Sequence, residues 1–308
     1  MELHESEGYS IAAMCKEAGV SRAAYYKWLN SIPSQKEIDD RNLAVLVDSL
    51  HYRYKGILGY RTMTLYVNRL YNKDCKPKRI RRIMKILGIH SAIRLKRENC
   101  TVRNPKDQAV DNVLDRDFEA SAPNMKWATD VTEFKIPGTS KKLYLSAIID
   151  LYDRSIVSFV IGPNNNNRLV FDTLKKALEA NPNAHPILHS DRGFQYTCPE
   201  FKKMLKQYGM IQSMSRVGSC LDNAPTEGFW GILKVEMNQM YKIFGEESLR
   251  TAIQAYVNFY NNDRLQARYE GKTPNEVRQE ALYSESPKQY PIPYNPRIQK
   301  YKAQFYAV

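Results

Sequence analysis

The segment from residue 127 to 260 constrains the fold most, because its apolar residues change spacing in a fixed order. Three strand-like apolar runs come first, joined by short connections that favour an antiparallel meander. Helical segments with one apolar face then alternate with two further strand-like runs. We expect strands at 127–136, 143–149, 155–161, 186–189 and 210–214, and helices after the four asparagines 164–167 and at 201–208, 223–240 and 246–260.

Three strands, helix, strand, helix, strand and helix is the element order of a ribonuclease H-like α/β fold. Such a fold has a mixed five-stranded sheet with helices on both faces. The first and fourth strands would then be neighbours at the centre of the sheet.

Three acids occupy matching places in that fold. Asp130 falls in the middle of the first strand, Asp191 directly after the fourth, and Glu227 in the first turn of a helix, just after Pro225. Two carboxylates about 4 Å apart repel by roughly 4 kcal/mol at an effective dielectric of 20, so such a cluster needs a cation or a shared proton. Oxygen ligands without a Cys or His cluster indicate Mg²⁺, with Mn²⁺ as a substitute, and two ions would suit phosphoryl transfer on DNA.

Other residues near these acids have plain structural readings. His189 lies near the metals or is a satisfied core histidine, and we favour the second. Asp150, Asp153 and Asp222 read as cap or turn residues, and Asp222 or Asn223 would cap the helix of Glu227. Trp230 reads as core or DNA-packing rather than catalytic.

Residues 41–106 carry ten arginines and seven lysines against three acids, a net charge of +14. Apolar residues recur there at helical spacing, with Gly88 ending the last of three amphipathic helices. A solvated face is the simplest reading, but such a face mixes both signs, so phosphate binding is favoured. The side chains expected to face DNA are Arg79, Arg81, Arg82 and Lys85.

Residues 10–30 read as two short helices around Gly19, capped by Ser10 and Ser21, which is a helix-turn-helix pattern. Arg22 and Lys27 would face DNA, while Tyr25, Trp28 and Leu29 would point inward. A plain helical hairpin packed on a neighbour fits the pattern equally well, and the charge of the chain favours DNA. The polar residues 31–40 would link this pair to the basic helices.

The net charge of +13 and the pI of about 9.4 indicate a polyanionic partner. No apolar run approaches the roughly 20 residues of a membrane-spanning helix, and the acidic first residues do not read as a signal peptide. The five cysteines are scattered and odd in number, which indicates free thiols in a reducing cytoplasm.

Three motifs carry a family resemblance: WATD at 127–130, HSDRGFQY at 189–196 and DNAPTEGFWGILKVE at 222–236. They resemble the integrase core of DDE transposases, and most closely the catalytic, OrfB-type protein of the insertion-sequence three family. Thirty-five residues separate Asp191 from Glu227, the spacing that names the group. In that family a basic residue at the position of Lys234 helps to hold the DNA end, whereas Gln266 replaces a frequent His and receives no role.

The resemblance implies a reaction on double-stranded DNA. A water activated by metal ions nicks the terminal inverted repeat, and the resulting 3′-hydroxyl attacks a second phosphodiester, first at the other element end and later in target DNA. Two ends held together imply a homo-oligomer, and the family often fuses this protein to the product of an upstream reading frame. A non-catalytic DNA-binding regulator and a structure-selective nuclease on the same fold remain as alternatives.

We divide the chain into five parts. Residues 1–34 would be the helix-turn-helix, 35–106 the basic helical DNA-binding domain and 107–123 a linker that begins to dock at Leu114 and Phe118. Residues 124–281 would be the catalytic core with a C-terminal helix. Residues 282–308, rich in Pro and Tyr, would be an extended tail that packs on a partner subunit or on DNA.

Overall fold

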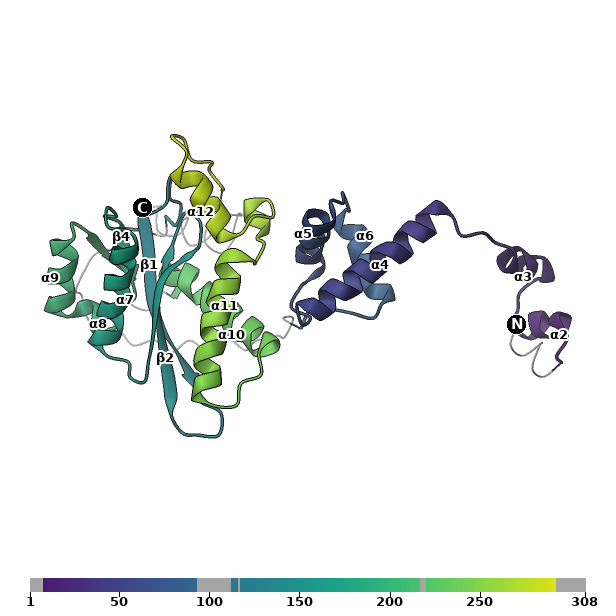
Figure 1. Cartoon of the computed structure of the whole chain (residues 1–308), viewed down its shortest axis with the longest axis horizontal. Coiled ribbons are helices and arrows are strands. Elements are labelled where there is room, and N and C mark those ends of the chain that lie inside the picture. Colours follow the sequence, from purple (N-terminus) through teal and green to yellow (C-terminus); the bar gives the residue numbers. More distant parts are fainter. Residues whose placement is uncertain (1–7, 93–111, 116, 217–219, 292–308) are drawn as a thin grey trace, which may run out of the picture.

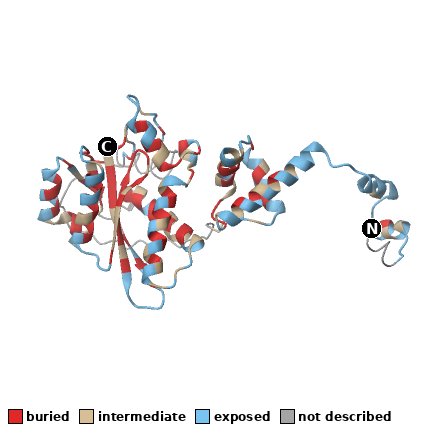
Figure 2. Ribbon diagram, in the orientation of Figure 1, coloured by how far each residue is buried: buried red, intermediate tan, exposed pale blue. Residues whose placement is uncertain are grey.

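The computed structural model describes residues 8–92, 112–115, 117–216 and 220–291 of the 308-residue chain. A sheet flanked by helices makes up the larger body, and the N-terminal helices extend to one side of it (Figure 1). Buried residues concentrate in the strands and on the inward faces of the helices (Figure 2). Within these ranges, none of the helices has the length and apolar character that crossing a membrane would need.

The sheet has five strands in the order β3-β2-β1-β4-β5, which confirms the mixed sheet expected from the sequence. The first three strands form the antiparallel meander, and β4 and β5 run parallel to β1. β2 is buried along almost its whole length because helices cover both faces. The strands are β1 (Lys126–Lys135), β2 (Lys142–Asp150), β3 (Ile156–Gly162), β4 (Ile187–Ser190) and β5 (Ile211–Met214).

The helices cover the sheet in two groups (Figure 1). On one face, α7 (Asn167–Ala180), α8 (Phe194–Thr197) and α9 (Pro199–Gln207) share a core with Trp127 and Ile148. On the other face, α10 (Ala224–Met240) and α11 (Glu246–Asn262) share a core with Leu145 and Ile149. Successive side chains of β2 thus enter opposite cores. The expected helices are confirmed, and the short α8 was not expected.

Two carboxylates at the end of β2 and in the following turn join α12 (Pro274–Leu282) to the sheet. Asp150 and Asp153 are fully buried, and each accepts a hydrogen bond of 3.0 Å from the guanidinium of Arg278. Asp153 also accepts from the backbone N–H of Ser155, so its expected role in a turn is confirmed. The ion pairs with α12 were not expected, because the partner lies 125 residues or more away in sequence.

The first two helices, α2 (Ile11–Glu17) and α3 (Arg22–Leu29), are capped by Ser10 and Ser21 as expected. The expected inward orientation of the apolar side chains of α3 is wrong for Trp28, which is 68% exposed, and for Leu29, which is 37% exposed. The reason is that α2 is the only helix with substantial contact to α3 among the described elements, and one short helix cannot cover both side chains.

The basic segment folds as three helices, α4 (Gln35–Arg53), α5 (Tyr60–Tyr71) and α6 (Pro77–Ile86). Their buried side chains include Leu43, Val47 and Ile80, which confirms the amphipathic pattern, although Leu70 and Leu87 are exposed. The linker expected at 31–40 ends earlier. Ser34 and Glu37 form a capping box, so the helix begins at Gln35.

The basic helices dock on the sheet-containing body through α5. The hydroxyl of Tyr66 donates to the carbonyl of Asp263 at 2.8 Å, and Arg69 forms an ion pair with Glu276 of α12. Arg69 also donates to the carbonyl of Gly271 at 2.7 Å. A single body therefore contains both the sheet and the basic helices.

The connecting and C-terminal segments pack on the same body. Leu114 and Phe118 are buried, which confirms where the linker docks. The tail up to residue 291 is irregular but contacts its own chain. Tyr290 is buried against Tyr269, and the carbonyl of Lys288 accepts a hydrogen bond from Tyr152. The expected contact of the tail with a partner subunit or DNA stays a prediction. Residues 292–308 and 93–111 lie outside the described ranges.

Candidate active site

Asp130 lies on the central strand β1, opposite Ala147 of β2. Its side chain is half-buried and is held by two donors that carry no charge. The backbone N–H of Val131 donates to Oδ1 at 2.8 Å, and the indole Nε1 of Trp230 donates to Oδ2 at 3.0 Å. Both bonds fix the carboxylate without neutralising it.

Asp191 follows β4, the strand that runs parallel to the start of β1, with Ala128 paired to His189. The carboxyl end of β4 therefore brings Asp191 towards the level of Asp130. The backbone N–H of Gly193 donates to its Oδ1 at 2.8 Å. A Cβ at Gly193 would lie 3.0 Å from that oxygen and 2.8 Å from Oε1 of Gln195, so the turn HSDRG needs glycine there.

Glu227 lies in the first turn of α10, and its side chain is exposed. Pro225 occupies the start of the helix, as the sequence predicts. Asn223, one of the two residues expected to cap this helix, occupies the N-cap position, but its side chain makes no capping hydrogen bond. Asp222 is fully buried and forms an ion pair with Arg216 at 2.9 Å.

Electrostatic coupling links the three acids. Burial, followed by the charges of Asp191 and Glu227, raises the pKa of Asp130 from 3.8 to about 7. Burial raises the pKa of Asp191 and outweighs the hydrogen bond from Gly193, which lowers it. Burial and the charge of Asp191 raise the pKa of Glu227. The fold thus brings three carboxylates within reach of one another's fields, and burial raises the pKa of each of them.

No internal cation offsets this repulsion. In residues 8–92, 112–115, 117–216 and 220–291, no Lys or Arg forms an ion pair with Asp130, Asp191 or Glu227. The same ranges contain no three acidic, His or Cys side chains close enough to hold one metal ion.

His189 is a satisfied core histidine, the reading that the sequence favoured. It is fully buried, and its two ring nitrogens lie 2.9 and 3.2 Å from the hydroxyls of Ser213 and Ser215. Burial lowers its pKa to about 4, so the ring is neutral near pH 7. His189 therefore packs in the core next to the acids and carries no charge near pH 7.

Sequence reasoning missed the role of Trp230. This side chain is 7% exposed and donates directly to Asp130, so it positions that carboxylate from α10. Its place three residues after Glu227 puts both on one face of the helix, but this spacing alone does not show that the indole reaches Asp130. Tyr196 was missed as well. Tyr196 is buried, and its hydroxyl lies 3.4 Å from that of Thr129. Burial raises the pKa of Tyr196 well above 10, and the charges of Asp130 and Asp191 raise it further.

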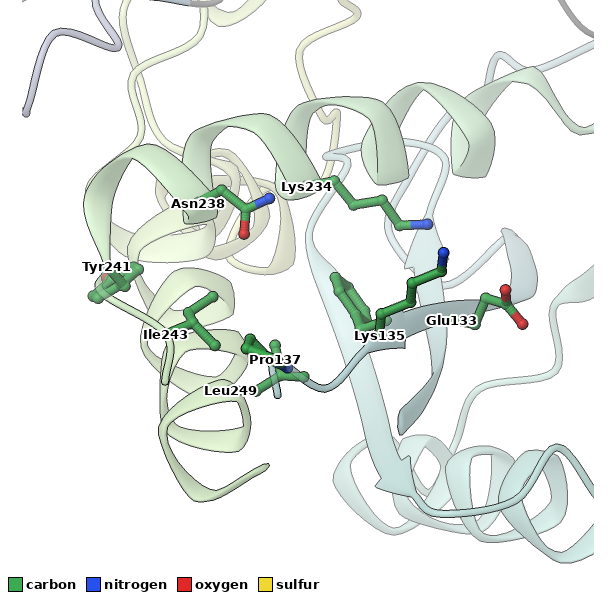
Figure 3. Close-up of a pocket in the computed structure, with 9 residues that line it drawn as sticks. Glu133, Lys135, Pro137, Lys234, Asn238, Tyr241, Ile243 and Leu249 are labelled. Atoms are coloured by element: carbon green, nitrogen blue, oxygen red, sulfur yellow. The ribbon is translucent and has the colours of Figure 1, made fainter. Parts of the chain in front are cut away.

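Lys234, seven residues after Glu227, lies on the same helix, with its ammonium 5.3 Å from the centre of the Phe134 ring. It lines a groove between α10 and β1 (Figure 3). The structure thus places this lysine beside the strand that carries Asp130, on an open surface.

The other residues expected to contact DNA fall into two groups. Arg22, Lys27, Arg81 and Lys85 are exposed. Arg79 and Arg82 both form ion pairs with Asp40 of α4, an acid just outside the segment counted in the sequence. The side chain of Arg82 is still 49% exposed. All six stay predictions as DNA contacts.

Family models match three stretches of the chain. Models described as integrase core domain match residues 120–220 and 227–282, and one described as HTH-like domain matches residues 37–97. The HTH-like match falls on the basic helices α4 to α6, downstream of the helix pair in which the sequence suggested that motif.

Relatives match over most of their length. A protein designated a transposase, InsK of insertion sequence element IS150 from Escherichia coli (strain K12), is 35% identical over 271 residues, 88% of this chain and 94% of that protein. Transposase InsF of insertion sequence IS3A from the same organism is 28% identical over 92% of this chain and 98% of that protein. Among solved structures, the HTLV-2 integrase catalytic core domain in complex with magnesium is 19% identical, with a TM-score of 0.40, over 51% of this chain and 97% of that chain.

Proposed function

The chain belongs to the insertion-sequence transposases with an integrase core, and on that premise we propose that Asp130, Asp191 and Glu227 form the triad with which it cuts and joins DNA. The observation that carries the proposal is the electrostatic coupling of two half-buried carboxylates at the central strand pair, neither of which forms an ion pair with a Lys or Arg of the described residues. Acids that are merely structural are usually paired with a cation when they are buried.

The residues fit divalent cations by the chemistry of their donors. All three side chains offer carboxylate oxygens, the ligands that Mg²⁺ prefers and Mn²⁺ accepts. Their raised pKa values mark a place where added positive charge stabilises the folded chain. Asp130 and Asp191 would hold the ions from the sheet, and the exposed Glu227 would complete the set by turning inward from α10. When bound, two ions would stabilise the attacking and leaving oxygens of a phosphodiester.

The chain's own residues orient the reaction. Trp230 and the N–H of Val131 hold both oxygens of Asp130, and Gly193 holds Asp191, so the carboxylates keep a fixed position relative to the scissile phosphate. In the first step water attacks phosphorus, the bond to the 3′ oxygen breaks, and the strand keeps a 3′-hydroxyl. In the second step that hydroxyl attacks another phosphodiester, so one bond forms as one breaks and no covalent protein–DNA intermediate is needed.

DNA binding is a property of the family modules, and we assign the contacts to the basic helices and α10. Arg81 and Lys85 lie exposed on α6, and Arg22 and Lys27 lie exposed on α3. Lys234 would contact the strand that enters the catalytic site. Because α5 is fixed to the core through Tyr66 and Arg69, DNA bound by the basic helices has a defined position relative to the acids.

The assembly that this chemistry needs is also part of the proposal. Strand transfer between two element ends requires both to be held together, which favours a homo-oligomer on terminal inverted repeats and target DNA. An association or fusion with the product of the upstream reading frame would add DNA contacts. The reaction would take place on DNA of the bacterial nucleoid, in the cytoplasm.

The test uses a duplex oligonucleotide that carries the terminal inverted repeat flanking the gene, incubated with the full chain with and without Mg²⁺. We expect nicks that leave a 3′-hydroxyl and, with time, joined strands, both dependent on Mg²⁺ or Mn²⁺. If neither nicks nor joined strands form with Mg²⁺ or with Mn²⁺, the proposal is wrong. Nicks without joined strands would indicate a nuclease on the same fold, and binding alone would indicate a regulator.

A further inference from the structure

A groove of about 500 Å³ lies between the second half of β1 and the end of α10 (Figure 3). One side is formed by Phe134 and Pro137, and the other by Asn238 and Tyr241, with Ile243 beyond them. Phe134 is almost fully buried, whereas Asn238 is exposed. The groove is therefore open to solvent, with apolar walls and an amide at its edge.

The groove continues from the proposed catalytic acids along the same two elements. Lys135 follows Asp130 by five strand residues, about 16 Å, and Lys234 follows Glu227 by seven helical residues, about 10 Å. At roughly 3.4 Å per base step, these distances correspond to about three to five base steps. A DNA strand with its reacting phosphate at the acids would reach the groove without leaving β1 and α10.

The charge at the mouth of the groove is positive. Figure 3 shows Lys135 and Lys234 running towards the same end of the groove, where Glu133 is the acid that also lines it. The carboxylate of Glu133 is already bonded to Lys142 at 2.8 and 2.9 Å. Because Glu133 is bonded to Lys142, the lysines 135 and 234 leave the mouth with a net positive charge, which a phosphodiester oxygen complements.

The remainder of the groove suits a flat, partly polar group. Tyr241 offers a half-buried ring, and the side chains of Pro137 and Ile243 extend the apolar wall. The amide of Asn238 can donate and accept at once, as the edge of a nucleobase requires. A base enters such a site only when it is unpaired, because stacking within a duplex covers both of its faces.

We propose that this groove binds one backbone phosphate and the unpaired base attached to it, three to five base steps from the reacting phosphate. The inference rests on the proposed function, since it places the reacting phosphate at Asp130, Asp191 and Glu227. It adds that the DNA end is opened locally when it binds, and that Lys135, Asn238 and Tyr241 hold the opened strand.

The first test compares Lys135→Ala with Lys141→Ala in the full chain. Both lysines are exposed and lie on the same hairpin, but only Lys135 lines the groove. The probe is a fluorescent duplex carrying the terminal inverted repeat, titrated at several salt concentrations without divalent metal. We expect Lys135→Ala to weaken binding about fivefold and to lower the salt slope by about 1, with Lys141→Ala unchanged. Equal behaviour of the two variants would overturn the proposal.

The second test locates the phosphate and the base. Replacing single phosphates by methylphosphonates should weaken binding to the wild type at one position three to five steps from the cut, and should not weaken it further in Lys135→Ala. 2-Aminopurine at the adjoining base should change its fluorescence on binding, and Asn238→Ala or Tyr241→Ala should abolish that change. A signal at no position in this window, or one that persists in both variants, would overturn the assignment.

These binding measurements separate the groove from the catalytic proposal. They require no cleavage. If the chain never cuts DNA but the methylphosphonate effect depends on Lys135, the proposed reaction is wrong and the proposed groove stands. If the chain cuts DNA with Mg²⁺ but the methylphosphonate effect does not depend on Lys135, the proposed groove is wrong and the proposed reaction stands. A change of oligomeric state in Lys135→Ala or Tyr241→Ala, without any coupling to DNA, would assign the groove to a second copy of the chain and overturn the proposal.

Discussion

Two groups of carboxylates lie on the same sheet, and the fold treats their charges differently. Asp150 and Asp153 are fully buried and share the guanidinium of Arg278. Asp130 and Asp191 are less buried, and the donors that they receive from the described residues are uncharged, from Trp230 and backbone N–H groups. The first group has its cation within the chain and joins α12 to the sheet. For the second group we propose a cation from outside, as in a catalytic metal site.

The largest difference between the groups should appear in activity. Asp191→Asn keeps the shape of the side chain and its acceptor for Gly193 but removes a charge, so strand cleavage should fall by about a thousandfold or more. Rates of Mg²⁺-dependent nicking measure this, with Asp172→Asn as control, a half-buried acid on α7 that forms an ion pair with Arg168. DNA affinity should not change. Loss of DNA binding in Asp191→Asn would make the residue structural, like Asp150.

The second group should respond in stability instead. Arg278→Met keeps most of the volume but leaves two buried carboxylates without their cation, which costs about 3 to 5 kcal/mol of unfolding free energy. Urea denaturation of the full chain measures the loss. Asp191→Asn, which relieves repulsion, should stabilise the metal-free chain in the same assay. If both variants destabilised the chain equally, the two groups would not differ as described.

The acidity of Asp130 gives a third contrast. Since its pKa is raised from 3.8 to about 7, the folded chain binds this proton more tightly than the unfolded chain does. Stability should therefore fall as the pH rises from about 4 to 7, by about 2 kcal/mol once access of water to the site is allowed for. Urea denaturation across this range should show the fall in the wild type, and both Asp130→Asn and added Mg²⁺ should reduce it. A slope unchanged in Asp130→Asn would contradict the assignment.

The smallest effect concerns the uncharged donor. Trp230→Phe removes the indole N–H that bonds Asp130 and keeps an aromatic ring in the core. We expect nicking to slow by about tenfold, since a hydrogen bond to a charged group is lost while the carboxylate remains. Phe229→Leu on the same helix is the control, because Phe229 packs in the core and makes no bond to the acids. Equal rates for Trp230→Phe and wild type would remove its positioning role.

Sequence patterns predicted only part of the difference between the two groups of carboxylates. The element order placed β1 beside β4, so the approach of Asp130 and Asp191 followed from the sequence. The bond from Trp230 did not follow, because helical spacing does not show which side chain of a face reaches the sheet. The Arg278 pairs join residues far apart in the chain, a distance over which periodicity carries no information. The limits of the five domains and the roles of the site residues stay predictions.

The orientation of Trp28 teaches the same lesson at the other end of the chain. The helical period of α3 was correct, but its apolar residues have too little neighbouring structure to bury them. A period identifies a face and does not supply the surface against which the face packs. The start of α4 at Gln35 could have been predicted from the sequence, because Ser34 and Glu37 form a capping box within residues 31–40, which were expected to be a linker.

Asp130 and Asp191 are proposed to bind a divalent cation from solution. Electron paramagnetic resonance of Mn²⁺ titrated into the full chain, with Mg²⁺ as competitor, tests it most directly. The account predicts Mn²⁺ bound by the wild type and by Asp172→Asn, displaced by Mg²⁺, and lost in Asp191→Asn. Absence of bound Mn²⁺ in the wild type, or equal binding in Asp191→Asn, would contradict it.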